Sequence, residues 1–148
     1  MAQQDLFQIG GAITMHRGSC LCGQVQYEVD DSLGPIVFCH CSICRKSTGS
    51  AHQAVTRTPS ASFRIVRGQD VLREFCYEPS HHRYFCANCG SGIYARRDSK
   101  PEIVIVRLGT LDTPVDQEIS AHIFVGSKAS WDNIPDDAPK HQEWPPSS

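Results

Sequence analysis

The sequence predicts a mostly β domain of about eight to ten short strands. Three observations support this fold class. Short segments alternate polar and apolar residues, which is the period of a half-buried strand. No long helical period occurs anywhere in the chain. Seven of the eight cysteines in 148 residues stand in closely spaced sets, and bound metal would compensate for a modest core.

The first strands lie on either side of a cysteine-rich segment. QVQYEV (24–29) alternates polar and apolar residues, and PIVFC (35–39) is a second strand that enters the cysteines. SICRKST (42–48) predicts a short helical turn with Ser42 as its N-cap. AHQAVTR (51–57) is the next strand, with His52 near its start.

The second half of the chain predicts further strands and an irregular tail. SFRIVRG (62–68) and VLREFCYE (71–78) flank a glycine turn and predict a hairpin. HRYFCANCGSGIYAR (82–96) is a strand, a tight turn and a strand, and ISAHIFV (119–125) is the last strand. The apolar run EIVIVRL (102–108) predicts a strand buried on both faces. The proline-rich tail cannot stay regular, and we expect Trp131 and Trp144 to anchor parts of it.

Length and charge limit the function classes. The length suits one domain, and we expect residues 1–15 to be a flexible arm and residues 16–148 a single zinc-binding β domain. A net charge of −2 gives no global attraction to nucleic acid or to an anionic membrane. The N-terminus lacks a secretory pattern, and no segment approaches the roughly 18 apolar residues of a membrane span. We therefore expect a cytoplasmic protein, whose thiols stay reduced.

Two cysteine pairs predict a structural metal site. The motifs C-x-C-G at 20–23 and C-x-x-C-G at 86–90 each offer a pair of thiolates and a glycine that permits positive φ. Together they supply the four ligands of a closed tetrahedral zinc site, Cys20, Cys22, Cys86 and Cys89. Such a site would staple the first hairpin to a later one. A secreted, disulfide-built domain is the alternative, but pairs this close in sequence cannot staple distant segments.

Three further cysteines predict a second metal site of a different kind. Cys39 and Cys41 point to the same side of an extended segment, and Cys44 can curl back toward them. His40 points the other way, so we expect it to be hydrogen-bonded on the opposite face. Cys76 could be a fourth ligand, but a lone strand cysteine is more typical of a small buried hydrophobe. In that case the ion has three protein ligands and one exchangeable position, as catalytic zinc has.

A zinc ion held by three thiolates suits chemistry at sulfur. It is a soft site that favours a sulfur ligand, and a coordinated thiol is held as the nucleophilic thiolate. The site could therefore bind a small thiol and present it to an electrophile such as an aldehyde. In reverse it would break a carbon–sulfur bond.

Several segments in this order resemble one known family: GSCLCGQVQYEV, FCHCSICRKSTGS, RYFCANCGSGIY, RLGTLD and HIFVGSKASW. They are similar to the glutathione-dependent formaldehyde-activating enzymes, also called the centromere-protein-V-like family, from about Arg17 to Trp131. The resemblance implies an Mss4-like β-tent, with a structural zinc on the two cysteine pairs and a second, catalytic zinc on Cys39, Cys41 and Cys44. It also implies a carbon–sulfur lyase of the S-(hydroxymethyl)glutathione synthase type, with glutathione as co-substrate.

Other polar residues are weaker candidates. Arg45 and Lys46 follow the last ligand and could bind the carboxylates of a glutathione-like thiol, although solvated surface charge is the alternative. His52 could act as an acid or base near the metal, but we expect that it does not. We expect the His81–His82 pair to lie in a surface loop.

The sequence thus favours an enzyme whose partners are a small-molecule thiol and an electrophile, with no nucleic acid and no membrane. The alternative is a non-catalytic zinc-binding module for protein or nucleic acid. The near-neutral charge and the lack of a basic, aromatic strand face favour the enzyme. The oligomeric state is left open.

Overall fold

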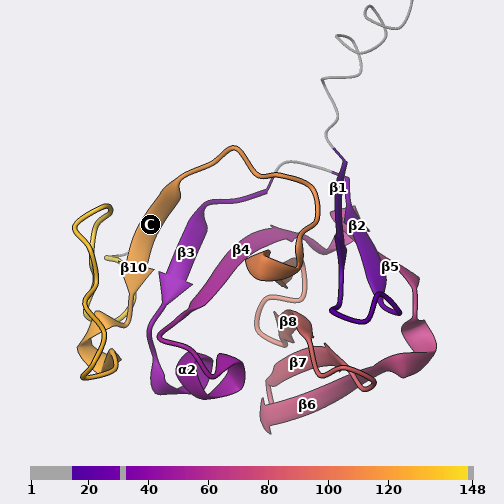
Figure 1. The fold of residues 1–148 in the computed structure, drawn as a ribbon, viewed down its shortest axis with the longest axis horizontal. Coiled ribbons are helices and arrows are strands. Elements are labelled where there is room, and N and C mark those ends of the chain that lie inside the picture. The colour runs from indigo at the N-terminus through magenta and orange to yellow at the C-terminus, as the bar shows by residue number, and fades with distance from the viewer. Residues whose placement is uncertain (1–14, 31–32, 147–148) are drawn as a thin grey trace, which may run out of the picture.

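The computed structural model describes residues 15–30 and 33–146. Within these ranges the chain forms ten strands, one short α-helix and four 3₁₀ turns, arranged in two sheets (Figure 1). The mostly β prediction is confirmed. Residues 1–14 of the expected arm lie outside the described residues. No helix in the described part of the chain is long and apolar enough to cross a membrane.

The smaller sheet has three antiparallel strands in the order β1-β2-β5. Its strands are β1 (His16–Ser19), β2 (Gln26–Val29) and β5 (Phe63–Arg67). Along β2, Tyr27 and Val29 are buried while Gln26 and Glu28 are half-buried. The alternation predicted for this segment therefore places one face of the strand in the core.

The larger sheet has seven strands in the order β10-β3-β4-β9-β8-β7-β6. These strands are β3 (Ile36–Cys39), β4 (Gln53–Pro59), β6 (Leu72–Glu78), β7 (His81–Cys86), β8 (Gly92–Arg97), β9 (Ile103–Arg107) and β10 (Ile119–Ile123). Neighbours are antiparallel except β10 and β3, which run parallel. In Figure 1 the sheet curves from β10 round to β6, and the smaller sheet stands at one side.

The hairpin predicted for residues 62–78 is wrong. β5 pairs with β2 in the small sheet, whereas β6 pairs with β7 in the large one. Between them Gly68, at φ +85°, and the 3₁₀ turn η2 (Gln69–Val71) redirect the chain. The turn is therefore the crossing point between the two sheets.

The main core lies between the two sheets. It includes Tyr27 and Phe63 from the small sheet and Ile93, Val104 and Val106 from the large one. The prediction that the 102–108 run is buried on both faces is only half right. Val104 and Val106 are fully buried, but Ile103 and Ile105 on the other face are only half-buried.

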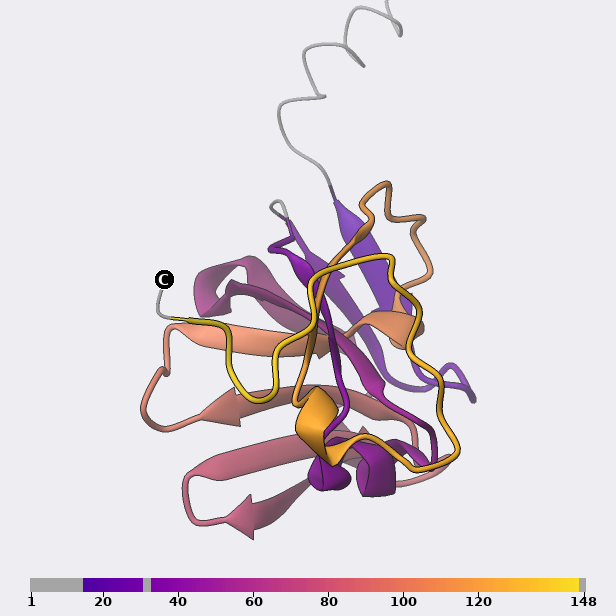
Figure 2. The same ribbon diagram turned by 90° about the vertical axis from the view of Figure 1, so that its left-hand side faces the viewer.

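The tail lies against β10, at the edge of the large sheet (Figure 2). The His122 backbone N–H donates to the Pro139 carbonyl, and the His141 N–H donates back to the His122 carbonyl. Trp144 packs edge-on against Phe124 with ring centroids 5.0 Å apart, so it anchors the tail as predicted. Trp131 is 71% exposed, so the same prediction is wrong for that residue.

Candidate metal centres

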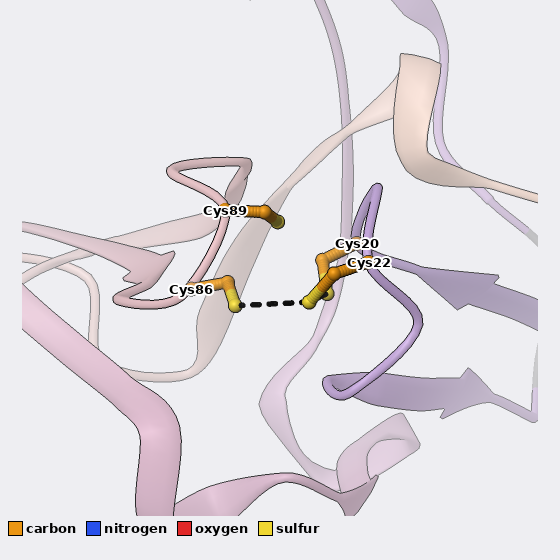
Figure 3. A group of neighbouring side chains, drawn as sticks. All are labelled: Cys20, Cys22, Cys86 and Cys89. Carbon is orange, nitrogen blue, oxygen red and sulfur yellow. Dashed lines mark hydrogen bonds between the residues drawn. The ribbon is translucent and has the colours of Figure 1, made fainter.

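Four cysteines from the two sheets converge on one point (Figure 3). Cys20 and Cys22 follow β1, Cys86 ends β7, and Cys89 lies in the turn before β8. Their sulfur atoms all lie within 4.8 Å of one another. The Cys20–Cys22 and Cys22–Cys86 sulfurs are 3.5 and 3.8 Å apart. A tetrahedral ion with zinc–sulfur bonds of about 2.3 Å separates its ligands by about 3.8 Å. The four sulfurs therefore fit zinc with little movement.

The glycine after each pair has the predicted conformation. Gly23 and Gly90 have φ of +81° and +84°. The first turn directs the Val25 N–H at the Cys20 sulfur over 3.3 Å, and the second closes a 2.7 Å bond from the Gly90 N–H to the Cys86 carbonyl. Backbone donors at a ligand sulfur stabilise its thiolate form.

The thiols of this cluster differ in acidity. The hydroxyl of Ser91, 3.3 Å from the Cys89 sulfur, lowers the pKa of Cys89 to about 5. Burial raises the pKa of Cys86 to about 11. A thiolate is therefore present at neutral pH before a cation deprotonates the buried thiols.

Three more cysteines meet where β3 leads into helix α2 (Ser42–Thr48). Cys39 ends the strand and Cys44 lies in the first turn of the helix, and both are buried. The predicted N-cap, Ser42, is wrong: Cys41 is the N-cap, and its sulfur accepts the Cys44 N–H over 3.3 Å. The capping role holds Cys41 in place, and the three sulfurs lie within 4.8 Å of one another.

The three thiols of this cluster lie in contact and change one another's pKa. Hydrogen bonds from the Cys39 and Cys44 thiols lower the pKa of Cys41 to about 2, and the same contacts raise the pKa of Cys39. The three sulfurs thus compete for negative charge in a largely buried position. A divalent cation would allow all three to ionise, because it supplies the compensating charge.

His40 points away from its cysteine neighbours, as predicted. It is 1% exposed, and its Nε2 lies 3.0 Å from Nδ1 of His122. His122 in turn contacts Asp137 over 2.8 Å. Desolvation lowers the pKa of His40 to about 4, so the ring is neutral at physiological pH. His52 stacks on Phe38 with centroids 4.2 Å apart, and its role as acid or base stays untested.

Two predictions about the far end of the large sheet are wrong. Cys76 is exposed rather than buried, because β6 is an edge strand on which only Leu72 is buried. It groups with Glu74 and His82 and not with the three-cysteine cluster, so it is not the fourth ligand there. His81 and His82 lie in strand β7 and not in a loop.

A cavity of about 530 Å³ lies against the three-cysteine cluster, and Cys39 is part of its wall. Strands β3, β4, β7, β8, β9 and β10 and the tail line it, the tail through Trp144 and Pro145. Five of its residues are arginines: Arg57, Arg83, Arg96, Arg97 and Arg107. Arg45 and Lys46 are not among its lining residues, and Arg45 Nε donates instead to the Ser127 carbonyl over 3.2 Å. Their contact with substrate stays a prediction.

The arginines make the cavity wall positively charged. Arg107 is 8% exposed and forms no ion pair within residues 15–30 and 33–146. Burial lowers the pKa of Arg107 to about 10, so it stays charged at neutral pH. Arg83 Nε is buried with no hydrogen-bond partner in this part of the chain. Burial of the Arg107 guanidinium without an ion pair is costly, so this wall of the cavity favours negative charge.

Known proteins resemble this chain over the segment that holds both cysteine clusters. The model of one family, described as glutathione-dependent formaldehyde-activating enzyme, matches residues 15–127, a range that contains all seven clustered cysteines of the two sites. A protein of Halomonas elongata named "Putative glutathione-dependent formaldehyde-activating enzyme" is 29% identical over 125 residues, which is 79% of each chain. A crystal structure of a Rhodobacter sphaeroides protein matches with a TM-score of 0.58 and 26% identity, over 70% of this chain and 96% of that one.

Proposed function

Because the chain belongs to the family of glutathione-dependent formaldehyde-activating enzymes, we propose that it is a zinc-dependent carbon–sulfur lyase. It joins a small thiol, glutathione or a close relative, to an aldehyde such as formaldehyde, and catalyses the reverse cleavage. One observation carries this proposal: Cys39 belongs both to the three-cysteine cluster and to the wall of an arginine-rich cavity.

The donor set of the cluster fits zinc. Cys39, Cys41 and Cys44 place three sulfurs within 4.8 Å of one another in a mostly buried position, and zinc prefers thiolates in a tetrahedral arrangement. Three protein ligands leave one position of such an ion for a substrate atom. Zinc would hold a substrate thiol at this position as its nucleophilic thiolate.

The cavity fits the rest of a glutathione-like molecule. Its volume of about 530 Å³ is within the range of small-molecule sites. Glutathione carries two carboxylates, and arginine pairs with carboxylates through two parallel hydrogen bonds. The arginines of β4, β7, β8 and β9 would bind these carboxylates. Val37, Val55 and Ile105 form an apolar part of the wall, which would contact the rest of the tripeptide. The thiol would then point at the wall that contains Cys39.

The reaction needs no oxidant or reductant. The thiolate sulfur attacks the carbonyl carbon, a carbon–sulfur bond forms, and the π electron pair moves to the oxygen, which takes a proton from solvent. In the reverse direction the hydroxyl loses its proton and the carbon–sulfur bond breaks.

The test is zinc content and thiol-dependent turnover in matched variants. Cys44→Ser should bind one zinc fewer per chain than the wild type and lose at least about 100-fold in turnover with glutathione and formaldehyde, since it removes a ligand. Ser47→Ala is the control. The Ser47 hydroxyl donates to the Cys44 carbonyl over 3.2 Å, so this variant alters the same helix without removing a metal ligand. Circular dichroism checks the fold. A folded Cys44→Ser protein with full activity would refute the proposal.

A further inference from the structure

A third group of metal-ligating side chains lies on strands β6 and β7, apart from the two cysteine clusters. It consists of Glu74, Cys76 and His82, whose ligand atoms all lie within 4.8 Å of one another. Cys76 stands directly opposite His82 in the antiparallel pair, and Glu74 is two residues earlier, on the same face of β6. The Cys76 sulfur is 2.8 Å from Glu74 Oε2 and 3.2 Å from His82 Nδ1. His82 Nδ1 also contacts Glu74 Oε2.

The second nitrogen of His82 is oriented by another carboxylate. Its Nε2 lies 2.9 Å from Oδ1 of Asp98, just beyond the end of β8. Metal-bound histidines typically donate their other ring N–H to a carboxylate, which fixes the ring and strengthens the ligand. The contact with Asp98 therefore leaves Nδ1 of His82 directed at Glu74 and Cys76 as a ligand nitrogen.

We propose that Glu74, Cys76 and His82 form a third metal site, which binds zinc or a similar borderline divalent cation. Zinc takes thiolate, imidazole and carboxylate ligands together, whereas hard cations such as magnesium do not favour sulfur. One thiolate and one carboxylate also neutralise the charge of a divalent ion. His82 lines the arginine-rich cavity, so the ion sits at the cavity's border.

A purely hydrogen-bonded group is the alternative. It requires His82 to be a cation that donates from both nitrogens, one to Glu74 and one to Asp98, while the Cys76 thiol also donates to Glu74. A zinc ion would instead place its sulfur, nitrogen and oxygen ligands about 3.3–3.6 Å apart, as follows from bond lengths of about 2.0–2.3 Å. The exposed side chains of Glu74 and Cys76 can reach this spacing by small rotations. Only the metal-bound arrangement makes the reactivity of Cys76 depend on zinc.

The test uses the full-length protein and follows Cys76 itself. Iodoacetamide alkylation of the Cys76 peptide is measured by mass spectrometry, with added zinc and after brief chelation. In the wild type, zinc should slow alkylation at least about tenfold, because a metal-bound thiolate is protected. His82→Gln and Glu74→Gln should abolish this protection, and each should lower the zinc content by one ion per chain.

Two further variants distinguish ligand loss from general damage. Glu78→Gln removes a carboxylate from the same strand that pairs with His81 and lies outside the cluster, so zinc should still protect Cys76. Asp98→Asn leaves all three ligands but should weaken zinc affinity about 10- to 100-fold in a chelator competition. Equal alkylation rates with and without zinc in the wild type would overturn the proposal. So would an unchanged zinc content in a folded His82→Gln protein. Neither result bears on the three-cysteine site, whose cysteines are unaltered.

Discussion

Gly68 shows how a single residue fixes the path of the chain. It has φ +85°, and a Cβ built there would lie 2.1 Å from the backbone carbonyl oxygen of Gln24. Both the conformation and the close approach exclude a side chain. Gly68→Ala should therefore lower the free energy of unfolding by at least about 3 kcal/mol, measured by urea denaturation.

Gly92, at the start of β8, is the matched control. Its φ lies outside the left-handed region, and no atom lies within 4 Å of a built Cβ. Gly92→Ala should change stability by less than about 1 kcal/mol. Equal losses in the two variants would contradict the role assigned to Gly68.

In the proposed function, the charge of Arg107 serves binding at the expense of stability. Its guanidinium is buried in the cavity wall and unpaired in the described chain, so a methionine of similar length should be tolerated. Arg107→Met should keep or raise the melting temperature. The variant should also raise the KM for glutathione roughly 10- to 100-fold, because a hydrogen bond to a charged group contributes about 1.5–3 kcal/mol.

The double variant Arg45→Gln with Lys46→Gln tests the other candidate for carboxylate binding. These residues follow Cys44 but do not line the cavity, so KM should change less than about threefold, because charges near the surface and outside the binding site contribute little. A large rise in KM in this variant, with none in Arg107→Met, would place the thiol's carboxylates outside the cavity.

The same residues show what the sequence could and could not reveal about the site. The seven clustered cysteines could be found because their spacing is a local feature, and a glycine follows each of the two pairs at 20–22 and 86–89. Cys76, in contrast, becomes a candidate ligand only because β6 is paired with β7, which brings His82 opposite it. The cavity arginines come from four strands, and no local motif connects them.

At the scale of elements, the strand β10 joins the three-cysteine segment to the tail. It pairs in parallel with β3 and carries His122, whose ring contacts His40, the residue directly after β3, and Asp137 in the tail. His122→Ala would leave Nε2 of the buried His40 without this partner and would remove the contact that ties Asp137 to the strand. We expect a loss of about 2–4 kcal/mol in the free energy of unfolding by urea denaturation.

Ser120, exposed on the same strand, supplies the comparison. Ser120→Ala should change stability by less than about 0.5 kcal/mol. If His122→Ala were equally mild, the histidine contacts would not be what holds β10 and the tail together.

Strand positions were predictable from alternation, but strand partners were not. Residues 62–68 and 71–78 both form strands, yet their pairing depends on the positive φ of Gly68 and on core partners elsewhere. The half-exposed face of β9 was also hidden, because an unbroken apolar run does not show that one of its faces lines a cavity. Local propensity gives the element, whereas tertiary packing gives its neighbours and its second face.

At the scale of the whole molecule, the four-cysteine cluster connects the two sheets. Cys20 and Cys22 belong to the turn after β1 in the small sheet, and Cys86 and Cys89 belong to β7 and its turn in the large one. An ion there would close a long loop of chain and would hold both sides of the main core together. The three-cysteine cluster, in contrast, spans only residues 39–44, so an ion there constrains one short segment.

This difference predicts unequal losses of stability from the same chemical change. Cys86→Ser should lower the free energy of unfolding by at least about 4 kcal/mol and the melting temperature by about 10–20 °C, because metal binding at this site contributes to folding. Cys44→Ser should cost less than about 2 kcal/mol, since its ion closes no long loop. Chelation of the wild type should reproduce the larger loss once zinc leaves the four-cysteine site. Equal melting temperatures for the two variants would show that the two sheets hold together without the metal, and that both clusters serve something other than the fold.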